Sequence, residues 1–133
     1  VFLISFRRGA AWLRDVSILA SSPGGNRFPP GMNGQDDMTL KLSADFEPRH
    51  GEAVPVAPGV VRITARNPSP FTFHGTNSYL IGRDSLAVID PGPDDEEHFR
   101  ALLKAADGRP ISHIFISHTH RDHSPLAARL AEI

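Results

Sequence analysis

The chain has 133 residues, with 14 Lys and Arg residues against 15 Asp and Glu residues, and a formal net charge of −1. This length allows one domain at most, and 40% hydrophobic residues with 22% charged residues are typical of a globular chain rather than a disordered one. The near-zero charge gives no indication of a nucleic-acid partner, and the absence of Cys excludes disulfides, a thiolate nucleophile and Cys-ligated zinc.

The first 45 residues carry no strong pattern. Scattered apolar residues between Phe2 and Leu19 have the spacing of a weak amphipathic helix. Residues 21–37 are rich in Gly, Pro, Ser and Asn and are typical of a flexible linker. We therefore predict that residues 1–45 are disordered or a misassigned N-terminal extension. In the second case residues 1–31 are the upstream extension, and the natural product starts at Met32 or Met38.

A targeting signal is the weaker interpretation of this stretch. A secretory signal has its positive charges before its apolar segment, whereas Val1–Phe6 precedes Arg7 and Arg8. A run of about 18 apolar residues, which would indicate a transmembrane helix, is absent from the sequence. We expect a cytoplasmic protein with no membrane partner.

Residues 46–133 are patterned and form the predicted domain. Three prolines make residues 46–58 irregular, and the β-branched segment Val60–Thr64 predicts a strand. A short extended piece is expected at Phe71–Phe73. The segments Thr76–Ile81 and Leu86–Ile89 flank a turn and predict a hairpin.

A helix is predicted over Asp95–Asp107, with Asp94 as its N-cap. Phe99, Leu102, Leu103 and Ala106 form its apolar stripe.

A strand follows over Ile111–Ser117, and then a polar loop. Ser124 is placed to cap a last helix, with Pro125 at its first position. This order of elements predicts an α/β (α+β) fold, in which a mixed sheet carries helices on at least one face. The hairpin supplies antiparallel strands and the helical crossover supplies a parallel one.

Four potential metal ligands occupy six positions directly after the last strand: His118, His120, Asp122 and His123. In an extended loop, residues two apart point the same way, so His118 and His120 can converge on one ion while Asp122 and His123 turn towards a second. Imidazole and carboxylate suit zinc or a similar divalent ion, and two ions could activate one water.

The alternative is a polar surface loop that happens to be rich in His. The spacing and the position between a strand and a helix favour the metal site. The other histidines (His50, His74, His98 and His113) lack such a context, and we interpret each of them as structural.

The spacing His118-x-His120-x-Asp122-His123 resembles the HxHxDH signature of the metallo-β-lactamase superfamily. The segments Thr76–Ile81 and Ala87–Gly92 are similar to the opening hairpin of that family. The resemblance covers roughly residues 58–133 and implies the first half of an αββα sandwich.

The resemblance also implies a dinuclear zinc site. His118 and His120 would bind the first zinc, Asp122 and His123 would bind the second, and Asp122 would also be catalytic by orienting or deprotonating the attacking water. Asp90 matches an acidic residue near the site; its alternative role is that of a turn-forming Asp before Pro91.

Ser124-Pro125 follows the motif, where many members have Gly-Gly, and the stretch looks most like the branch of β-lactamase-like protein 2, near glyoxalase II. Members of this neighbourhood hydrolyse thioesters or cleave single-stranded RNA. The resemblance thus implies a hydrolase that acts on an ester, thioester or phosphodiester through a metal-bound hydroxide.

The family takes further His ligands and a bridging Asp from downstream segments, but no His or Asp follows His123 here. We therefore expect a fragment of a hydrolase that is inactive alone and binds zinc weakly. Two alternatives stay open: a short chain completed by association through an exposed sheet, with itself or a partner, and a non-catalytic remnant that acts as a weak metal-binding or interaction module.

Overall fold

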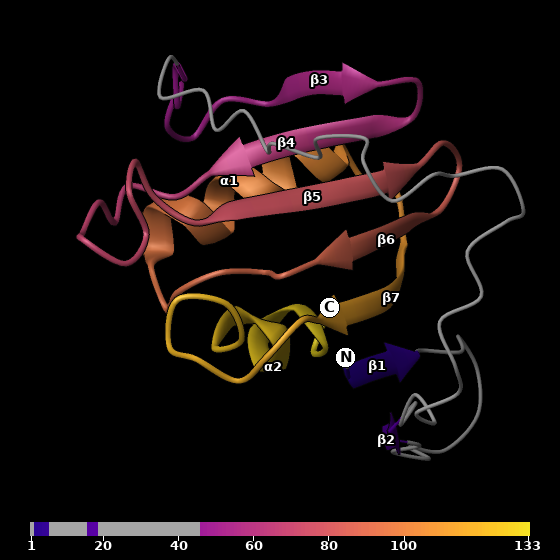
Figure 1. Ribbon diagram of the computed structural model, residues 1–133. Coiled ribbons are helices and arrows are strands. Elements are labelled where there is room, and N and C mark those ends of the chain that lie inside the picture. Colours follow the sequence, from indigo (N-terminus) through magenta and orange to yellow (C-terminus); the bar gives the residue numbers. More distant parts are fainter. Residues whose placement is uncertain (1, 6–15, 19–45) are drawn as a thin grey trace, which may run out of the picture.

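The computed structural model describes residues 2–5, 16–18 and 46–133, and its strands form one mixed sheet (Figure 1). The strands are β1 (Phe2–Ser5), β2 (Val16–Ile18), β3 (Val54–Ala57), β4 (Val60–Thr64), β5 (Asn77–Gly82), β6 (Leu86–Ile89) and β7 (Ile111–Ile116), and the helices are α1 (Glu96–Ala106) and α2 (Leu126–Leu130). Across the sheet the order is β2-β1-β7-β6-β5-β4-β3.

All neighbouring strands of this sheet are antiparallel except β6 and β7, which run parallel. Helix α1 makes the crossover between these two strands (Figure 1). The carboxyl ends of β6 and β7 therefore lie side by side, so that Asp90 and Ser117 begin neighbouring loops at the same edge of the sheet. The mixed sheet, the hairpin of β5 and β6 and the α/β class are confirmed.

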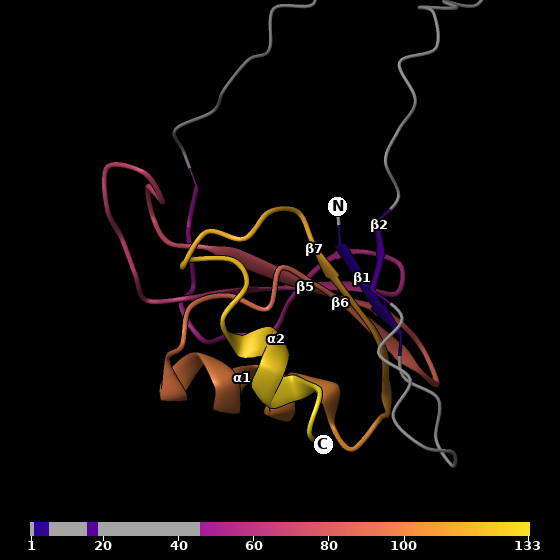
Figure 2. The same ribbon diagram turned by 90° about the horizontal axis from the view of Figure 1, so that it is seen from below.

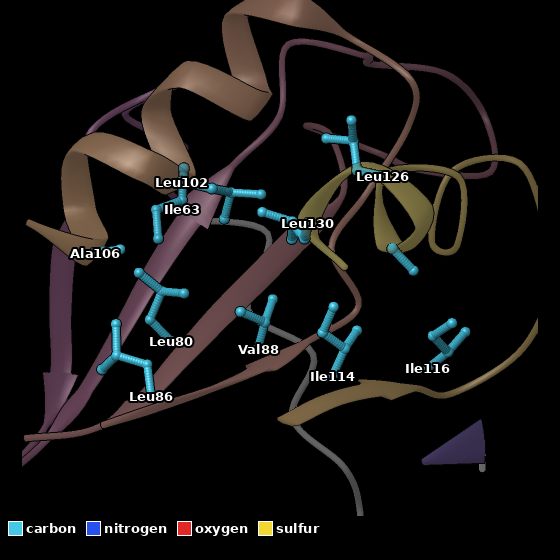
Figure 3. Close-up of a cluster of buried hydrophobic side chains, with 11 residues drawn as sticks. Ile63, Leu80, Leu86, Val88, Leu102, Ala106, Ile114, Ile116, Leu126 and Leu130 are labelled. Carbon is cyan, nitrogen blue, oxygen red and sulfur yellow. The ribbon is translucent and has the colours of Figure 1, made fainter. Parts of the chain in front are cut away.

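Both helices cover the same face of the sheet (Figure 2). Because side chains alternate along a strand, every second residue of β4 to β7 points into this layer. The buried hydrophobic residues of the core formed there are all aliphatic (Figure 3). Its buried members are Ile63, Leu80, Leu86, Val88, Leu102, Ala106, Ile114, Ile116, Leu126, Ala127 and Leu130.

Helix α1 begins one residue later than the sequence predicts. Its N-cap is Asp95, in extended conformation, and Asp95 Oδ1 accepts a hydrogen bond of 2.7 Å from the backbone N–H of His98. Asp94 is exposed and faces Arg129 of α2, with Arg129 Nη1 3.6 Å from Asp94 Oδ1. Two adjacent acidic residues both satisfy the N-cap preference, and the backbone conformation selects the second.

Three local predictions are wrong. Residues 54–57 form the edge strand β3, where Pro55 is tolerated because an edge residue need not donate to the sheet. Residues 71–73 lie in a turn closed by the hydrogen bond from Phe73 N to Ser69 O. Ser124 caps no helix: α2 begins after Pro125 without a side-chain cap, and Ser124 Oγ donates to His120 O instead.

The described part of the first 45 residues is strand rather than helix. β1 pairs antiparallel with β7, and β2 pairs with β1, so the predicted amphipathic helix is wrong at these positions. The predicted linker and both proposed start residues lie outside the described residues. Among the described residues, no helix has the length and the apolar character needed to cross a bilayer.

Candidate metal centre

The loop between β7 and α2 brings the predicted ligands together. His118, Asp122 and His123 each offer a ligand atom, and these atoms all lie within 4.8 Å of one another. The ring centroid of His118 lies 4.5 Å from that of His120 and 4.2 Å from that of His123. Three of the four predicted ligands thus converge, whereas His120 lies beside His118 but does not belong to the group of converging ligand atoms.

Backbone hydrogen bonds fold this loop into a turn. The carbonyl of His120 accepts from the N–H of His123 at 3.0 Å and from the N–H of Ser124 at 3.2 Å. The turn reverses the chain after His120 and returns His123 to the side of His118. A local turn thus accounts for the compactness of the cluster, since all its members come from six consecutive residues.

Asp90 joins the cluster from the end of β6. Its carboxylate accepts two hydrogen bonds of 2.7 Å, from Ser117 N to Oδ1 and from Ser117 Oγ to Oδ2. Oδ2 also lies 3.1 Å from His123 Nδ1. The backbone of Asp90 has a φ of 46°, in the left-handed region that costs a non-glycine residue free energy. The hydrogen bonds to Ser117 hold this carboxylate against the loop.

The imidazole of His123 lies between two carboxylates. Nδ1 faces Asp90 Oδ2 at 3.1 Å, and Nε2 faces Asp122 Oδ2 at 3.2 Å. Nδ1 is buried and makes no hydrogen bond. Both ring nitrogens of His123 therefore face carboxylate oxygens, and Nδ1 lacks a hydrogen bond to satisfy it.

A divalent cation would satisfy this nitrogen, because a ring nitrogen and a carboxylate oxygen can both bind it. The set of three imidazoles and a carboxylate is chemically suited to zinc. The residues present therefore fit the metal that the sequence motif predicts.

Behind Asp90, a buried imidazole contacts the segment that leads to α1. His98 of α1 is 2% exposed, and its Nε2 lies 2.9 Å from Ser78 Oγ. Ser78 Oγ in turn donates to the carbonyl of Asp90 at 2.5 Å. Burial lowers the pKa of His98 to about 4, against the opposing effects of Asp95 and the Pro91 backbone.

The contacts by which Ser78 and His98 reach the backbone of Asp90 cannot be predicted from the sequence pattern. His98 precedes Leu102 and Ala106 on the buried stripe of α1, so its position alone is that of a core residue. Ser117 offers a weak signal, since it ends a strand directly before the histidine cluster.

The remaining histidines lie outside the cluster. His113 stacks on Phe115, with ring centroids 6.2 Å apart, and its Nδ1 lies 3.0 Å from Ser112 Oγ. His50 Nε2 contacts the carbonyl of His74 at 2.6 Å. These contacts join neighbouring parts of the fold and do not involve the candidate metal centre.

Comparisons with known proteins point to one family. The family model described as "Metallo-beta-lactamase superfamily" matches residues 71–133. An atrochrysone carboxyl ACP thioesterase of Claviceps purpurea is 30% identical over 88 residues, which cover 64% of this chain and 28% of that protein. A beta-lactamase-like protein 2 homolog of Caenorhabditis elegans is 41% identical over 68 residues, which cover 48% of this chain and 23% of that protein.

A solved structure of similar fold is the crystal structure of a beta-lactamase domain protein from Burkholderia ambifaria. It matches with a TM-score of 0.52 and 31% sequence identity, over 67% of this chain and 28% of that one. The chain spans about a quarter of the length of the curated relatives it matches.

Proposed function

This chain belongs to the metallo-β-lactamase superfamily, and from that premise we propose that it supplies ligands to the dinuclear zinc site of a thioester hydrolase. The observation that carries the proposal is the cluster of His118, His120, Asp122 and His123, with Asp90 against His123. In this assignment His118 and His120 bind one zinc, and Asp122 and His123 bind the other.

Zinc, when bound, would supply Lewis acidity towards the substrate carbonyl and lower the pKa of a water molecule. Asp122 is the catalytic residue in this proposal: a carboxylate oxygen orients the attacking water and accepts its proton. Asp90 positions the imidazole of His123, which it contacts at Nδ1. No nucleophilic side chain is required, in keeping with the absence of Cys.

Four ligands for two zinc ions leave each ion short of the three protein ligands that a catalytic zinc commonly has. Further ligands must therefore come from outside the cluster. The activity is accordingly proposed for a protein in which the coordination is complete, rather than for residues 46–133 by themselves.

The thioester is favoured as substrate by the names of the relatives. The protein of Claviceps purpurea is a thioesterase by name, as is a protein of Cryptosporiopsis that is 36% identical over 74 residues. We propose a small-molecule thioester, with an oxygen ester as the nearest chemical alternative. The family resemblance also leaves cleavage of RNA open, and the assay of the chimera described below distinguishes it from cleavage of a thioester.

Metal binding is tested first, on the chain itself. Metal-free protein is titrated with Co2+, followed by its visible absorption spectrum, and with Zn2+, followed by calorimetry. We expect binding that is lost when His118 and His120 are both replaced by Ala. His113→Ala is the matched control, since this histidine lies outside the cluster and should leave the affinity unchanged. Equal binding by the double variant would refute the ligand assignment.

Thioester cleavage is tested in a chimera in which residues 46–133 replace the matching segment of the Claviceps purpurea thioesterase. Thiol release from acyl thioesters should persist in the chimera and fall at least a thousandfold with Asp122→Asn. Parallel assays use p-nitrophenyl acetate and a fluorogenic single-stranded RNA. Cleavage of RNA without cleavage of thioesters would overturn the substrate assignment.

A further inference from the structure

The buried imidazole of His98 lies between β5 and the segment after β6, next to the candidate metal centre. It contacts Ser78 of β5 through Nε2, and it packs against Gly92 in the segment after β6. A Cβ at Gly92 would lie 2.8 Å from His98 Cδ2 and Nε2, so the ring and this backbone are in close contact. Neither the sequence motif nor the ligand cluster includes His98.

The donor and acceptor in the contact between His98 and Ser78 can be assigned because the Ser78 hydroxyl carries only one proton. Ser78 Oγ donates its proton to the carbonyl of Asp90 and must therefore accept from His98. The chain of donors runs from His98 Nε2–H to Ser78 and then to Asp90 O. It fixes the backbone of Asp90, whose left-handed φ of 46° needs such support.

The second contact leads directly to the ligand loop. The N–H of Gly92 donates to the carbonyl of His123 at 2.9 Å, and the carbonyl of Gly92 accepts from the N–H of Leu126 at 3.3 Å. Gly92 thus connects His98 with a ligand residue and with the start of α2. Movement of the ring would displace both backbone groups of this residue.

We propose that His98 is a positioning residue for the metal centre: it holds the Asp90–Gly92 segment so that Asp90 and His123 keep the geometry in which the ligands converge. The proposal rests on the proposed function, because the metal is what this geometry serves. His98 touches neither substrate nor metal and acts through Ser78 and Gly92.

The test compares three variants of the full chain. His98→Leu keeps apolar volume and removes the donor to Ser78. His98→Gln restores a donor at the position of Nε2. Leu102→Ala is the matched control, because it creates a defect on the same buried face of α1 without a polar contact to the Asp90–Gly92 segment.

The first readout is amide hydrogen exchange in metal-free protein. The N–H groups of Ser117 and Gly92 report on the bonds to Asp90 Oδ1 and His123 O, and the N–H of Leu86, bonded to Pro110 O, is the reference. In His98→Leu we expect at least tenfold faster exchange at Ser117 and Gly92 relative to Leu86. In His98→Gln the exchange rates of these amides should return to within threefold of those in the parent protein. In Leu102→Ala the exchange rates at Ser117, Gly92 and Leu86 should change by the same factor.

The second readout is the affinity for Co2+ and its absorption spectrum. Loss of a group that supports metal ligands typically lowers affinity by about tenfold or more. We expect this loss and a changed spectrum in His98→Leu, with recovery in His98→Gln. Parent-like exchange in His98→Leu, failure of Gln to restore it, or an equal effect of Leu102→Ala would overturn the proposal.

The two proposals fail in different ways. If the parent chain binds no Co2+, the proposed metal site is wrong. The exchange comparison then still decides whether His98 holds the Asp90–Gly92 segment. If Co2+ binds with equal affinity and an identical spectrum in all variants, the metal site stands and the positioning role of His98 is refuted.

Discussion

Gly92 is a buried residue whose surroundings leave no room for an added side chain. Its φ of +95° disfavours any side chain, and a Cβ would meet His98 at 2.8 Å. We expect Gly92→Ala to lower the free energy of unfolding by about 3 kcal/mol. Gly108→Ala is the matched control, with a φ of +72° but nothing within 4 Å of its Cβ, and should cost about 1 kcal/mol. Urea unfolding of both variants measures the difference, and equal losses would contradict the steric argument.

Because burial lowers the pKa of His98, we expect the free energy of unfolding to depend on pH. Its pKa is lowered from 6.5 to about 4 by burial, so the unfolded chain takes up a proton at a higher pH than the folded chain does. The stabilisation is therefore complete above pH 6.5 and is lost as the pH falls towards 4. Between pH 7 and pH 5 we expect a loss of about 2 kcal/mol.

The measurement is urea unfolding of the parent chain and of His98→Gln at several pH values. The difference between their unfolding free energies should shrink by about 2 kcal/mol from pH 7 to pH 5. A difference that stays constant with pH would show that His98 takes up its proton at the same pH in both states.

The proposed ligands and the residues that support them differ in how far the sequence predicts them. His118, His120, Asp122 and His123 can be recognised because they crowd into six positions, where few structural roles require such residues. Ser78 and His98 lie 20 residues apart and meet only through the packing of α1 on β5. A contact of this kind leaves no periodicity in the sequence.

At the level of elements, α1 depends on its cap. Asp95 Oδ1 accepts from His98 N at 2.7 Å, whereas Asp94 makes only an exposed ion pair with Arg129. We expect Asp95→Ala to lower the free energy of unfolding by about 1 kcal/mol and Asp94→Ala by less than about 0.5 kcal/mol. Thermal unfolding of the two variants ranks them, and a larger effect of Asp94→Ala would contradict the cap assignment.

Elements with a strong apolar pattern are predicted well, and edge elements are not. The bounds of Val60–Thr64 and Leu86–Ile89 agree with β4 and β6 residue by residue. β3 was not predicted because Pro55 is a valid argument against an internal strand but not against an edge strand. The turn around Ser69 and Phe73 depends on hydrogen bonds made by Asn67 and Thr72, which the apolar pattern does not show.

At the level of the whole molecule, the described core comes from residues 63–130. We therefore propose that residues 46–133 fold without the first 45, and expect this truncated chain to unfold cooperatively in urea. Its stability should lie within about 2 kcal/mol of the full chain, since the described fold loses only β1 and β2, with the pairing of β1 to β7. A non-cooperative transition, or loss of the near-ultraviolet circular dichroism, would show that β1 is essential.

The topology follows from the sequence because a strand, a helix and a second strand of this length allow few arrangements. The crossover through α1 makes β6 and β7 parallel, and it places Asp90 beside the histidine loop although they lie far apart in the chain. How the first residues join this sheet was not predictable, because a short apolar segment such as Phe2–Ser5 is compatible with either helix or strand.

The six-residue span of the ligands has a thermodynamic consequence. The proposed ligands are neighbours in the chain and lie close together in the unfolded state as well, so we expect the denatured ensemble to retain some affinity for zinc. By linkage, a metal bound at the proposed site would raise the melting temperature only through the ratio of its affinities for the folded and the unfolded chain. Asp90, which approaches from another strand, is absent from the unfolded loop and contributes to that ratio. The rise in melting temperature on addition of zinc would therefore measure how much tighter the folded chain binds zinc than the unfolded chain does.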